Sequence, residues 1–369
     1  MILECSREKI KNAISAAERV TGKNLSLPVL SNIILETKDR VLQIKATNLD
    51  LGLTISLPIP GKTSQTGTIA VNGSILANFF NNFPTTEETI KLELVAGNLI
   101  ISSRQHATTV NGYPSDDFPL IPTIANPGSF LVDSHHLMST LKDVWSSAAV
   151  SNLKPEISSV CFYEQEDGLV VVATDSFRLA EKRLLNNKIS LPNLIVPLKN
   201  VSEIIKILDN ISGEVEVQYN QHQISFQAEN FYLTSRLIEG VFPDYRQIIP
   251  TRYETEVVVK RGDLLDLLKL SNVFTNKFNQ ADLTVTADDK NQIEIKTKND
   301  NGDNRSWLPA QSVTGSSVSI GFNLKYLLEG LAAIRTENVV LRLNGDSKPI
   351  VVAGVGDTSF TYLIMPIRR

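Results

Sequence analysis

The residues with the greatest capacity for chemistry follow an apolar run, in the stretch VVATDSFRLA at residues 171–180. Thr174, Asp175 and Ser176 offer two hydroxyls and a carboxylate, and Arg178 adds a guanidinium. A hydrolase could use Asp175 with a histidine as acid and base at such a strand end. The same residues are also typical of an ordinary turn, since Asp and Ser hydrogen-bond to their own backbone. The stretch alone leaves both interpretations open.

The other groups that could do chemistry are scattered. The adjacent His135 and His136 would lie on different sides of a helix, which makes a poor metal site, and His106 and His222 stand alone. The pair Asp116-Asp117 precedes Phe-Pro and favours a turn. The sequence contains no HExxH, CxxC, GxSxG or GxxxxGK[ST] motif. We therefore predict no catalytic residue, no metal site, no cofactor and no enzymatic activity.

The elements around VVATDSFRLA recur along the chain. The stretch KATNLD has the same form, and strand ends at Thr47, Thr174 and Thr297 are 127 and 123 residues apart. Helical patterns that begin at Arg7, Ser134 and Arg261 are 127 residues apart, and a second helical set from residues 71, 196 and 321 keeps a step of 125. A repeat of this length has the size of a domain. It predicts three domains at residues 1–126, 127–251 and 252–369.

Each predicted domain contains a helix, several strands, a second helix and further strands. Apolar residues at helical spacing, such as Ile10 and Ile14 in the first helix and Ile75 and Phe79 in the second, are expected to face the core. Stretches such as VLQIKAT and EVEVQYN alternate as strands do. The fold class is therefore α+β, with two helices of each domain packed on antiparallel sheets.

Charge divides unevenly between these elements. The six helical windows hold thirteen Lys and Arg against eight Asp and Glu, a net charge of +5, whereas the whole chain carries −4. Strands and loops must then carry −9. Lys and Arg are good helix formers and could simply solvate outer faces, but Glu forms helices as readily and is fewer. The alternative is a helix-lined basic surface for a phosphate backbone, without sequence recognition.

Composition also restricts the location. No run of 18 apolar residues is present, which excludes a membrane-spanning helix, and the first ten residues do not resemble a signal peptide. Cys5 and Cys161 are the only cysteines and form neither a disulfide framework nor a zinc motif. We expect a cytoplasmic protein without membrane contact.

Several stretches together resemble the bacterial DNA polymerase III β subunits, the replicative sliding clamps. These are LSLPVLSNI, VVATDSFRLA, IVPLKN, GVFPDYRQIIP, IGFNLKYLL and the terminal YLIMPIRR, and the resemblance covers the whole chain. It implies three DNA-clamp domains per chain and a head-to-tail homodimer, a ring of six domains with helices lining the hole. Such a ring would encircle double-stranded DNA irrespective of sequence and keep the replicative polymerase processive. The polymerase, the clamp loader and other proteins would dock through short peptides.

The resemblance also implies site residues. A peptide pocket between the second and third domains would comprise Ile157, Thr174, Phe177, Arg178, Leu179, Pro243, Gln247, Ile248, Pro349, Leu363, Ile364, Met365, Pro366 and Ile367. DNA contacts would be made by Lys23, Asn24, Lys199, Lys206, Lys269, Lys277 and Phe278. The dimer interface would include Thr108, Val273 and Phe274. Asn24, Leu198 and Asn279 depart from the basic residues that the family often has at these places.

A second hypothesis shares the pocket but not the ring. In it the chain is a three-domain scaffold that binds peptides and does not encircle DNA. Such a scaffold would need no basic helical surface, so charge reversal at Lys199 and Lys206 would leave its function intact.

Overall fold

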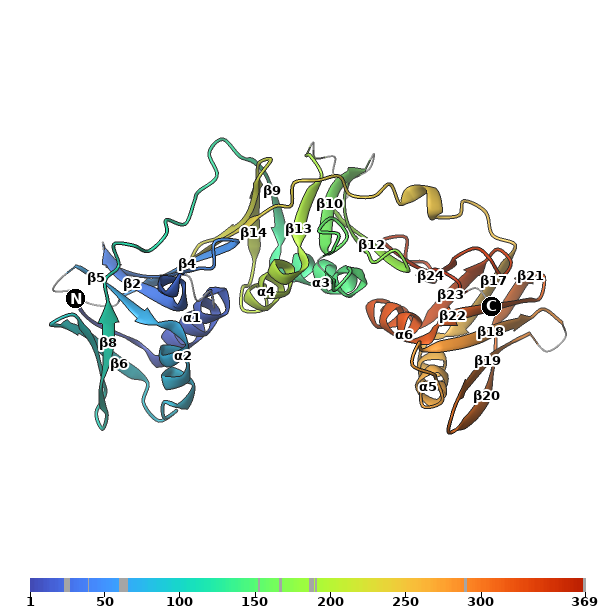
Figure 1. Ribbon diagram of the computed structural model, residues 1–369, viewed down its shortest axis with the longest axis horizontal. Helices are drawn as coiled ribbons and strands as arrows, with labels where there is room; N and C mark the ends of the chain where they lie inside the picture. Colours follow the sequence, from blue (N-terminus) through green and yellow to red (C-terminus); the bar gives the residue numbers. More distant parts are fainter. Residues whose placement is uncertain are drawn as a thin grey trace. The chain divides into compact units, whose positions relative to one another are not determined.

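The computed structural model describes the chain apart from residues 23–26, 39, 60–65, 152, 166–167, 186–188, 190, 289–290 and 368–369, and it forms two compact units (Figure 1). Unit 1 comprises residues 1–135 and 202–237, and unit 2 comprises residues 136–201 and 238–369. Each predicted end domain therefore lies within one unit, while the middle third of the chain contributes to both.

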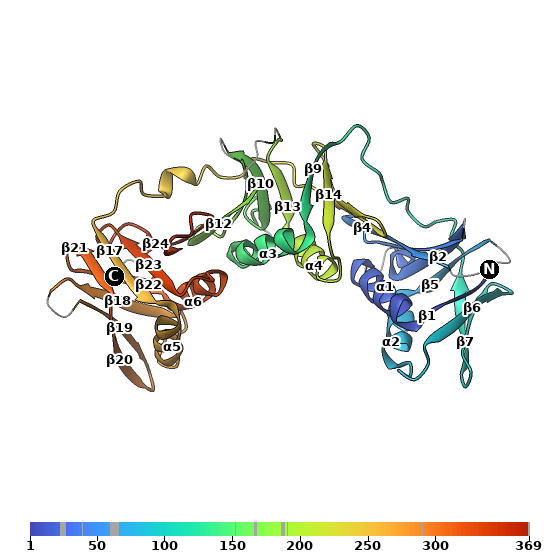
Figure 2. The ribbon, with the colours of Figure 1, turned by 180° about the vertical axis from the view of Figure 1, so that it is seen from behind.

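Unit 1 is built on one antiparallel sheet of 12 strands. In spatial order these are β1 (Ile2–Ser6), β6 (Thr89–Val95), β7 (Asn98–Ser102), β8 (Ala107–Tyr113), β5 (Gly67–Asn72), β2 (Asn32–Lys38), β3 (Val41–Thr47), β4 (Leu51–Pro58), β16 (Phe231–Arg236), β15 (Gln223–Ala228), β14 (Glu214–Tyr219) and β9 (Gly128–Asp133). Figure 2 shows β1, β6 and β7 together at one end of this sheet.

Helices α1 (Arg7–Val20) and α2 (Gly73–Asn82) of unit 1 pack against each other. The predicted core face of α1 is confirmed, since Ile10 and Ile14 are fully buried. In α2 the prediction was wrong: Ile75 is 56% exposed, and Leu76 and Phe80 face the core instead. The helix begins at the Asn72 cap, whose side chain accepts a hydrogen bond from the Ile75 amide, and this start sets the buried face one residue later.

Unit 2 contains two further antiparallel sheets. The larger has nine strands, in the order β13 (Leu194–Pro197), β10 (Ser159–Gln165), β11 (Gly168–Thr174), β12 (Arg178–Leu185), β25 (Phe360–Ile364), β24 (Ile350–Gly354), β23 (Asn338–Leu343), β17 (Thr255–Lys260) and β21 (Ser312–Gly315). The smaller has four strands, in the order β20 (Gly302–Pro309), β19 (Gln292–Asn299), β18 (Gln280–Thr286) and β22 (Val318–Asn323).

The remaining helices are α3 (Ser134–Val144), α4 (Leu198–Leu208), α5 (Arg261–Asn272) and α6 (Leu324–Ala333), with short 3₁₀ turns η1 (Pro28–Ser31), η2 (Trp145–Ser147) and η3 (Arg246–Ile248). Within unit 2, α5 and α6 contact each other, and α5 packs on β19 and β20 (Figure 1). No helix among the described residues is long and apolar enough to cross a membrane.

The order of elements repeats more finely than the sequence indicated. The expected helix, strands, helix and strands occur three times, and each copy is itself two runs of one strand, one helix and three strands, with β21 as an extra strand. The chain is thus six variations on one small motif. Alternation of apolar and polar residues is typical of antiparallel sheets that have helices on one face and solvent on the other. All described strand pairs are indeed antiparallel.

Two strand pairs join successive copies of the repeat. In unit 1, β4 of the first copy pairs with β16 of the second, with Leu53 opposite Leu233. In unit 2, β12 of the second copy pairs with β25 of the third, with Ala180 opposite Tyr362. Each copy has a first half and a second half, which are its two runs of elements. In both joints the last strand of the first half of one copy pairs with the last strand of the second half of the next copy. We call them the first and second joint.

Thr297 does not belong with the other two predicted strand ends. The hydroxyls of Thr47 and Thr174 each donate to a carbonyl four residues later, within a turn. The hydroxyl of Thr297 instead donates to the Ser271 carbonyl of α5, because its side chain faces the helix. The recurring step of the sequence was therefore one residue out of register in the third copy.

Candidate functional site

The turn at residues 174–178 has the geometry of a structural turn. The Asp175 Oδ1 atom accepts hydrogen bonds from the amides of Phe177 and Arg178, at 2.9 Å each. The Thr174 hydroxyl accepts from the Ser176 amide and donates to the Arg178 carbonyl. Ser176 adopts a left-handed backbone with φ of 76°. The Asp175 carboxylate and the Thr174 hydroxyl are thus both hydrogen-bonded to the backbone of the turn itself.

The Arg178 side chain lies beneath this turn and is only 9% exposed. Its Nε donates to the Asp175 Oδ2 atom at 3.0 Å, its Nη2 donates to the Ser146 carbonyl at 2.6 Å, and its Nη1 donates to Glu329 of α6. The Tyr326 ring lies 4.3 Å from the guanidinium carbon. Burial, followed by the charge of Asp175, raises the pKa of Tyr326. The three-residue spacing in the sequence is compatible with an ion pair between Asp175 and Arg178. No local pattern indicated that Glu329 or Tyr326 would contact Arg178.

The C-terminal strand completes the surroundings of the turn. In the second joint Arg178 lies opposite Ile364 and Leu179 opposite Leu363. One residue further on, the Met365 amide donates to the Phe177 carbonyl at 2.8 Å. The structure therefore brings together the two predicted parts of the pocket that are farthest apart in the sequence.

The predicted pocket residues divide into a buried and an accessible set. The buried set comprises Thr174, Arg178, Leu179, Pro349, Leu363 and Ile364. Residues that are exposed or half-buried are Ile157, Phe177, Pro243, Gln247, Ile248, Met365, Pro366 and Ile367. Phe177 is 63% exposed and Ile248 41%, while Met365 packs on the core that contains Leu179 and Leu363. Only the accessible set can contact a ligand directly, and the buried set supports it.

The segment with the FPDYR motif is fastened to the nine-stranded sheet. Phe242 and Tyr245 are buried, and the hydroxyls of Tyr245 and Tyr163 form a hydrogen-bonded cluster with the Glu181 carboxylate. Burial, with the charge of Glu181, raises the pKa of Tyr163 to about 12, and the same causes raise that of Tyr245. A hollow of about 300 Å³ beside this cluster includes Pro243 from the predicted pocket. The cluster holds the exposed η3 turn, with Gln247 and Ile248, against unit 2.

The described residues predicted for DNA contact are all exposed, and three of them lie on helices. Lys199 and Lys206 are exposed on α4, and Lys269 is exposed on α5. Lys206 pairs with Glu203 at 2.7 Å, and Lys269 with Asp266 at 3.4 Å, both within their own helix. Lys277 lies 5.1 Å above the ring of Phe278, which is 64% exposed. Lys23 and Asn24 lie outside the described residues.

The residues predicted for a dimer interface occur in both units. Thr108 is half-buried on β8 in unit 1, and Val273, at the end of α5 in unit 2, is 67% exposed. The ring of Phe274 lies beside Gly302, at the start of β20. Two further apolar residues are exposed on helices: Leu270 on α5 and Ile75 on α2, each 56% exposed. Ile75 was taken for core because helical spacing does not distinguish two apolar faces.

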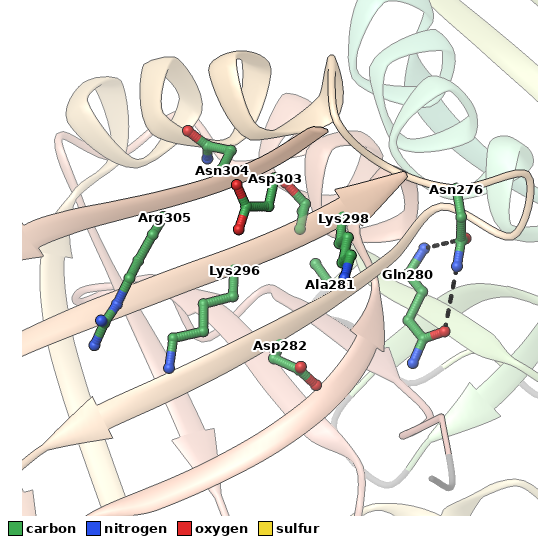
Figure 3. A pocket seen from close by; sticks show the side chains of 10 residues that line it. Asn276, Gln280, Ala281, Asp282, Lys296, Lys298, Asp303, Asn304 and Arg305 are labelled. Atoms are coloured by element: carbon green, nitrogen blue, oxygen red, sulfur yellow. Dashed lines mark hydrogen bonds between the residues drawn. The ribbon is translucent and has the colours of Figure 1, made fainter. Parts of the chain in front are cut away.

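Another hollow of unit 2 lies on the four-stranded sheet. It measures about 480 Å³, and Figure 3 shows Lys296 and Arg305 extending together on the side of the sheet that carries Asp282. Glu294 binds both Lys296 and Arg305, and its pKa is lowered because these hydrogen bonds outweigh the effect of burial. Cations and carboxylates alternate across this surface, which makes it a network of ion pairs without a dominant charge.

The described residues contain no group of His, Cys, Asp and Glu that could hold a metal ion. Cys5 and Cys161 are buried, and burial raises the pKa of each thiol to about 12. Both cysteines are therefore protonated at neutral pH and act as small apolar core residues.

Comparison with known families agrees with this geometry along the whole chain. Models of the DNA polymerase III beta subunit match its N-terminal domain at residues 1–122, its central domain at residues 131–244 and its C-terminal domain at residues 246–368. The three matches follow the order of the repeat in the structure.

Individual relatives are distant in sequence and close in fold. The beta sliding clamp of Synechococcus elongatus is 27% identical over all of this chain and 99% of its own, and that of Staphylococcus epidermidis 24% over 98% of both. The DNA polymerase III beta subunit of Thermotoga maritima superimposes with a TM-score of 0.92 at 25% identity, over 100% and 99% of the two chains. A Pseudomonas aeruginosa sliding clamp bound to griselimycin gives 0.93 at 24% identity, over the full length of both. With all three domain models matched in order, the chain belongs to the DNA polymerase III beta subunit family, the bacterial sliding clamps.

Proposed function

We propose that two copies of this chain close head to tail into a ring that encircles duplex DNA in the cytoplasm. The ring would have no catalytic role and would tether the replicative polymerase by offering it a peptide pocket. Topological retention allows weak contact with phosphates and free sliding, since dissociation does not depend on affinity. A tethered polymerase gains processivity through its effective concentration at the template.

The pattern of the two joints carries this proposal. Three first halves end in β4, β12 and β20, and three second halves end in β8, β16 and β25. The joints pair β4 with β16 and β12 with β25. Among the described strands this leaves β20 with β19 alone, while β8 pairs with β7 and, through two residues only, with β5. Unpaired edges invite a further strand, and β20 fits β8 of a second copy.

The joints also predict the register of this third contact. Leu53 and Ala180 lie opposite Ala46 and Ala173, each the last residue of the inward-facing alternation that precedes the turn threonine. On β19 the same alternation, Ile293, Ile295 and Thr297, ends at Thr297, so on β20 the same place belongs to Asn304, opposite Thr297. On the other side, Leu233 and Tyr362 lie opposite Phe226 and Val352, and on β8 this place belongs to Thr108, opposite Ile101. Asn304 should therefore face Thr108 of the second copy.

The helices beside these edges support the same contact. At the second joint Arg335, which follows α6, binds Asp143 of α3 through two hydrogen bonds of 2.9 and 3.0 Å. The counterpart of Asp143 in α5, 127 residues later, is the exposed Leu270, near the exposed Val273. Ile75 is exposed on α2, the helix of the same run of elements that ends in β8. The proposed interface would thus be apolar between helices, where the second joint is ionic.

A disulfide experiment tests the proposed contact. Asn304→Cys and Thr108→Cys in one chain should yield covalently closed dimers under mild oxidation, and each single variant should not. Sedimentation of the unmodified protein at micromolar concentration should give the mass of a dimer. A monomer, or crosslinking that is as strong in a Ser312→Cys control paired with Thr108→Cys, would contradict the proposed ring.

Topology distinguishes the ring from a peptide-binding scaffold. A dimer that is loaded first and crosslinked afterwards should stay on nicked circular plasmid in high salt and slide off after linearisation. The exposed Lys199, Lys206, Lys269 and Lys277 would make the weak direct contacts, so their reversal to Glu should lower loading. Equal retention on circular and linear plasmid, or no effect of charge reversal, would favour the scaffold.

The accessible set around Phe177 and Met365 is the proposed docking site for partner peptides. Half-buried and exposed apolar side chains with one flexible Met suit short peptides that insert a few apolar anchors. Met365→Ala should weaken binding of griselimycin, used as a probe, by about tenfold, the cost of about 1.4 kcal/mol of contact. Unchanged affinity would refute the assignment of this pocket.

A further inference from the structure

Arg178 carries more contacts than a pocket wall needs. Its guanidinium reaches three acceptors in three different segments: Asp175 in the turn, the Ser146 carbonyl in η2 and Glu329 on α6. The face of the guanidinium is covered by the Tyr326 ring, 4.3 Å away. With Nε, Nη1 and Nη2 all donating and 9% of the side chain exposed, little of this group remains for a ligand.

The Asp175 carboxylate couples this buried group to the exposed residue beside it. One oxygen, Oδ1, fixes the amides of Phe177 and Arg178, and the other, Oδ2, accepts from the Arg178 Nε atom. A displacement of the guanidinium would therefore displace the carboxylate, and with it the backbone that carries Phe177. The Phe177 carbonyl is in turn bound by the Met365 amide, so both accessible apolar residues depend on one arrangement.

The equivalent turn in unit 1 lacks this coupling. Residues 47–51 form the same backbone hydrogen bonds, but a buried Leu51 stands in place of Arg178 and Asp50 in place of Phe177. A guanidinium is thus not required to form this turn. It occurs where the turn presents an exposed aromatic side chain.

We propose that Arg178 is a positioning residue of the peptide pocket: it does not contact the bound peptide but ties the turn to α6 and η2 so that Phe177 is held ready for binding. The inference rests on the proposed docking function of Phe177 and Met365. On this proposal a partner peptide is recognised by its apolar contacts with Phe177 and Met365, and not by an ionic contact with Arg178.

A double-mutant cycle tests the assignment with griselimycin as the probe, measured by calorimetry on the full-length dimer. Phe177→Ala and Arg178→Met should each weaken binding by about tenfold, the effect of about 1.4 kcal/mol. The loss of affinity in the double variant should stay well below the product of the two single losses, because Arg178 acts through the backbone that carries Phe177. Losses that multiply to about a hundredfold would overturn the proposal, as would Arg178→Met with unchanged affinity.

Two further variants separate positioning from general stability. Leu51→Ala lowers stability at the matched turn of unit 1 and should leave griselimycin affinity unchanged. Glu329→Gln keeps shape and fold but weakens one anchor of Arg178, so it should reduce affinity about threefold even if Arg178→Met fails to fold. No change in Glu329→Gln would overturn the role of α6. If Phe177→Ala itself has no effect, the proposed pocket fails, and that outcome is distinct from a failure of the Arg178 assignment.

Discussion

The turns at residues 47–51 and 174–178 share one backbone and differ in what lies beneath it. Asn48 and Asp175 each accept hydrogen bonds from the amides two and three residues later, and Leu49 and Ser176 both have φ of 76°. A neighbouring strand end binds both turns alike: the Arg236 amide donates to the Asp50 carbonyl and the Met365 amide to that of Phe177, at 2.8 Å each.

The difference is confined to side chains. The first turn covers Leu51, which is 1% exposed, and the second covers the Arg178 guanidinium with its three anchors. Asp50 extends from the first turn where Phe177 extends from the second. The comparison teaches that the repeat supplies a frame, and that two or three substitutions on this frame distinguish a plain joint from a candidate docking site.

The largest effect should come from moving the charge into the wrong turn. Leu51→Arg would bury a guanidinium without the acceptors that Glu329 and the Ser146 carbonyl provide in unit 2. An uncompensated buried charge costs about 3–5 kcal/mol, so the free energy of unfolding in urea should fall by this amount. Leu51→Met keeps the volume and should cost less than about 1.5 kcal/mol. A loss from Leu51→Arg as small as that control would mean that the first turn already has suitable acceptors.

The next effect concerns the charge of the turn carboxylate. Asp175→Asn keeps the Oδ1 acceptor, as Asn48 does in the first turn, but loses the ionic partner of Arg178. Hydrogen bonds to charged groups contribute about 1.5–3 kcal/mol, and the unfolding free energy should fall by that much. The reciprocal Asn48→Asp should change it by no more than about 0.5 kcal/mol. Equal effects of the two substitutions would show that the guanidinium adds nothing to the second turn.

Alkaline pH should weaken unit 2 through Tyr163, whose hydroxyl contacts Tyr245 of the FPDYR segment. The DDFPLIP segment of unit 1 contains no tyrosine that could form a similar cluster. The pKa of Tyr163 is raised to about 12 by burial and by Glu181, above the value of about 10 in an unfolded chain. A raised pKa means that the stability is complete below pH 10 and is lost as pH rises toward 12, by about 2.7 kcal/mol at most, since each pKa unit corresponds to about 1.4 kcal/mol. Tyr163→Phe should remove this part of the decline in pH-dependent denaturation. An unaltered decline would place its origin elsewhere.

A smaller and equal effect is expected from the two turn threonines. Thr47→Val and Thr174→Val remove the same pair of hydrogen bonds while keeping the shape of the side chain. Each should lower the free energy of unfolding by about 1 kcal/mol. A difference larger than about 1 kcal/mol between the two would contradict the equivalence of the frames.

The smallest effect concerns the strained backbone. Leu49→Gly and Ser176→Gly relieve a left-handed conformation that costs L-residues about 1–2 kcal/mol, and this gain is offset by the greater freedom of glycine in the unfolded chain. Both variants should be neutral or more stable by about 0.5 kcal/mol in denaturant titrations. A clear loss in only one of them would mean that its side chain packs on something beyond the turn.

Sequence reasoning could reach the frame but not these differences. The repeat, the fold class and the α1 core followed from periodicity, because a packed helix must bury one face at a spacing near 3.6 residues. Ile75 was misjudged, since a helix with two apolar faces gives no indication which one is covered. The resemblance placed Arg178 among peptide contacts, whereas its partner Glu329 lies 151 residues away, beyond any local pattern.

Since sheets run through both joints, the thirds of this chain are not independent modules. A fragment cut at residues 126 and 251 would lose β4 from beside β16 and β25 from beside β12, two strand neighbours at once. Both freed edges would offer unpaired backbone groups to any other extended chain. An excised middle third is therefore expected to aggregate. A truncated or fused chain should keep both joints, which means keeping β4 with β16 and β12 with β25.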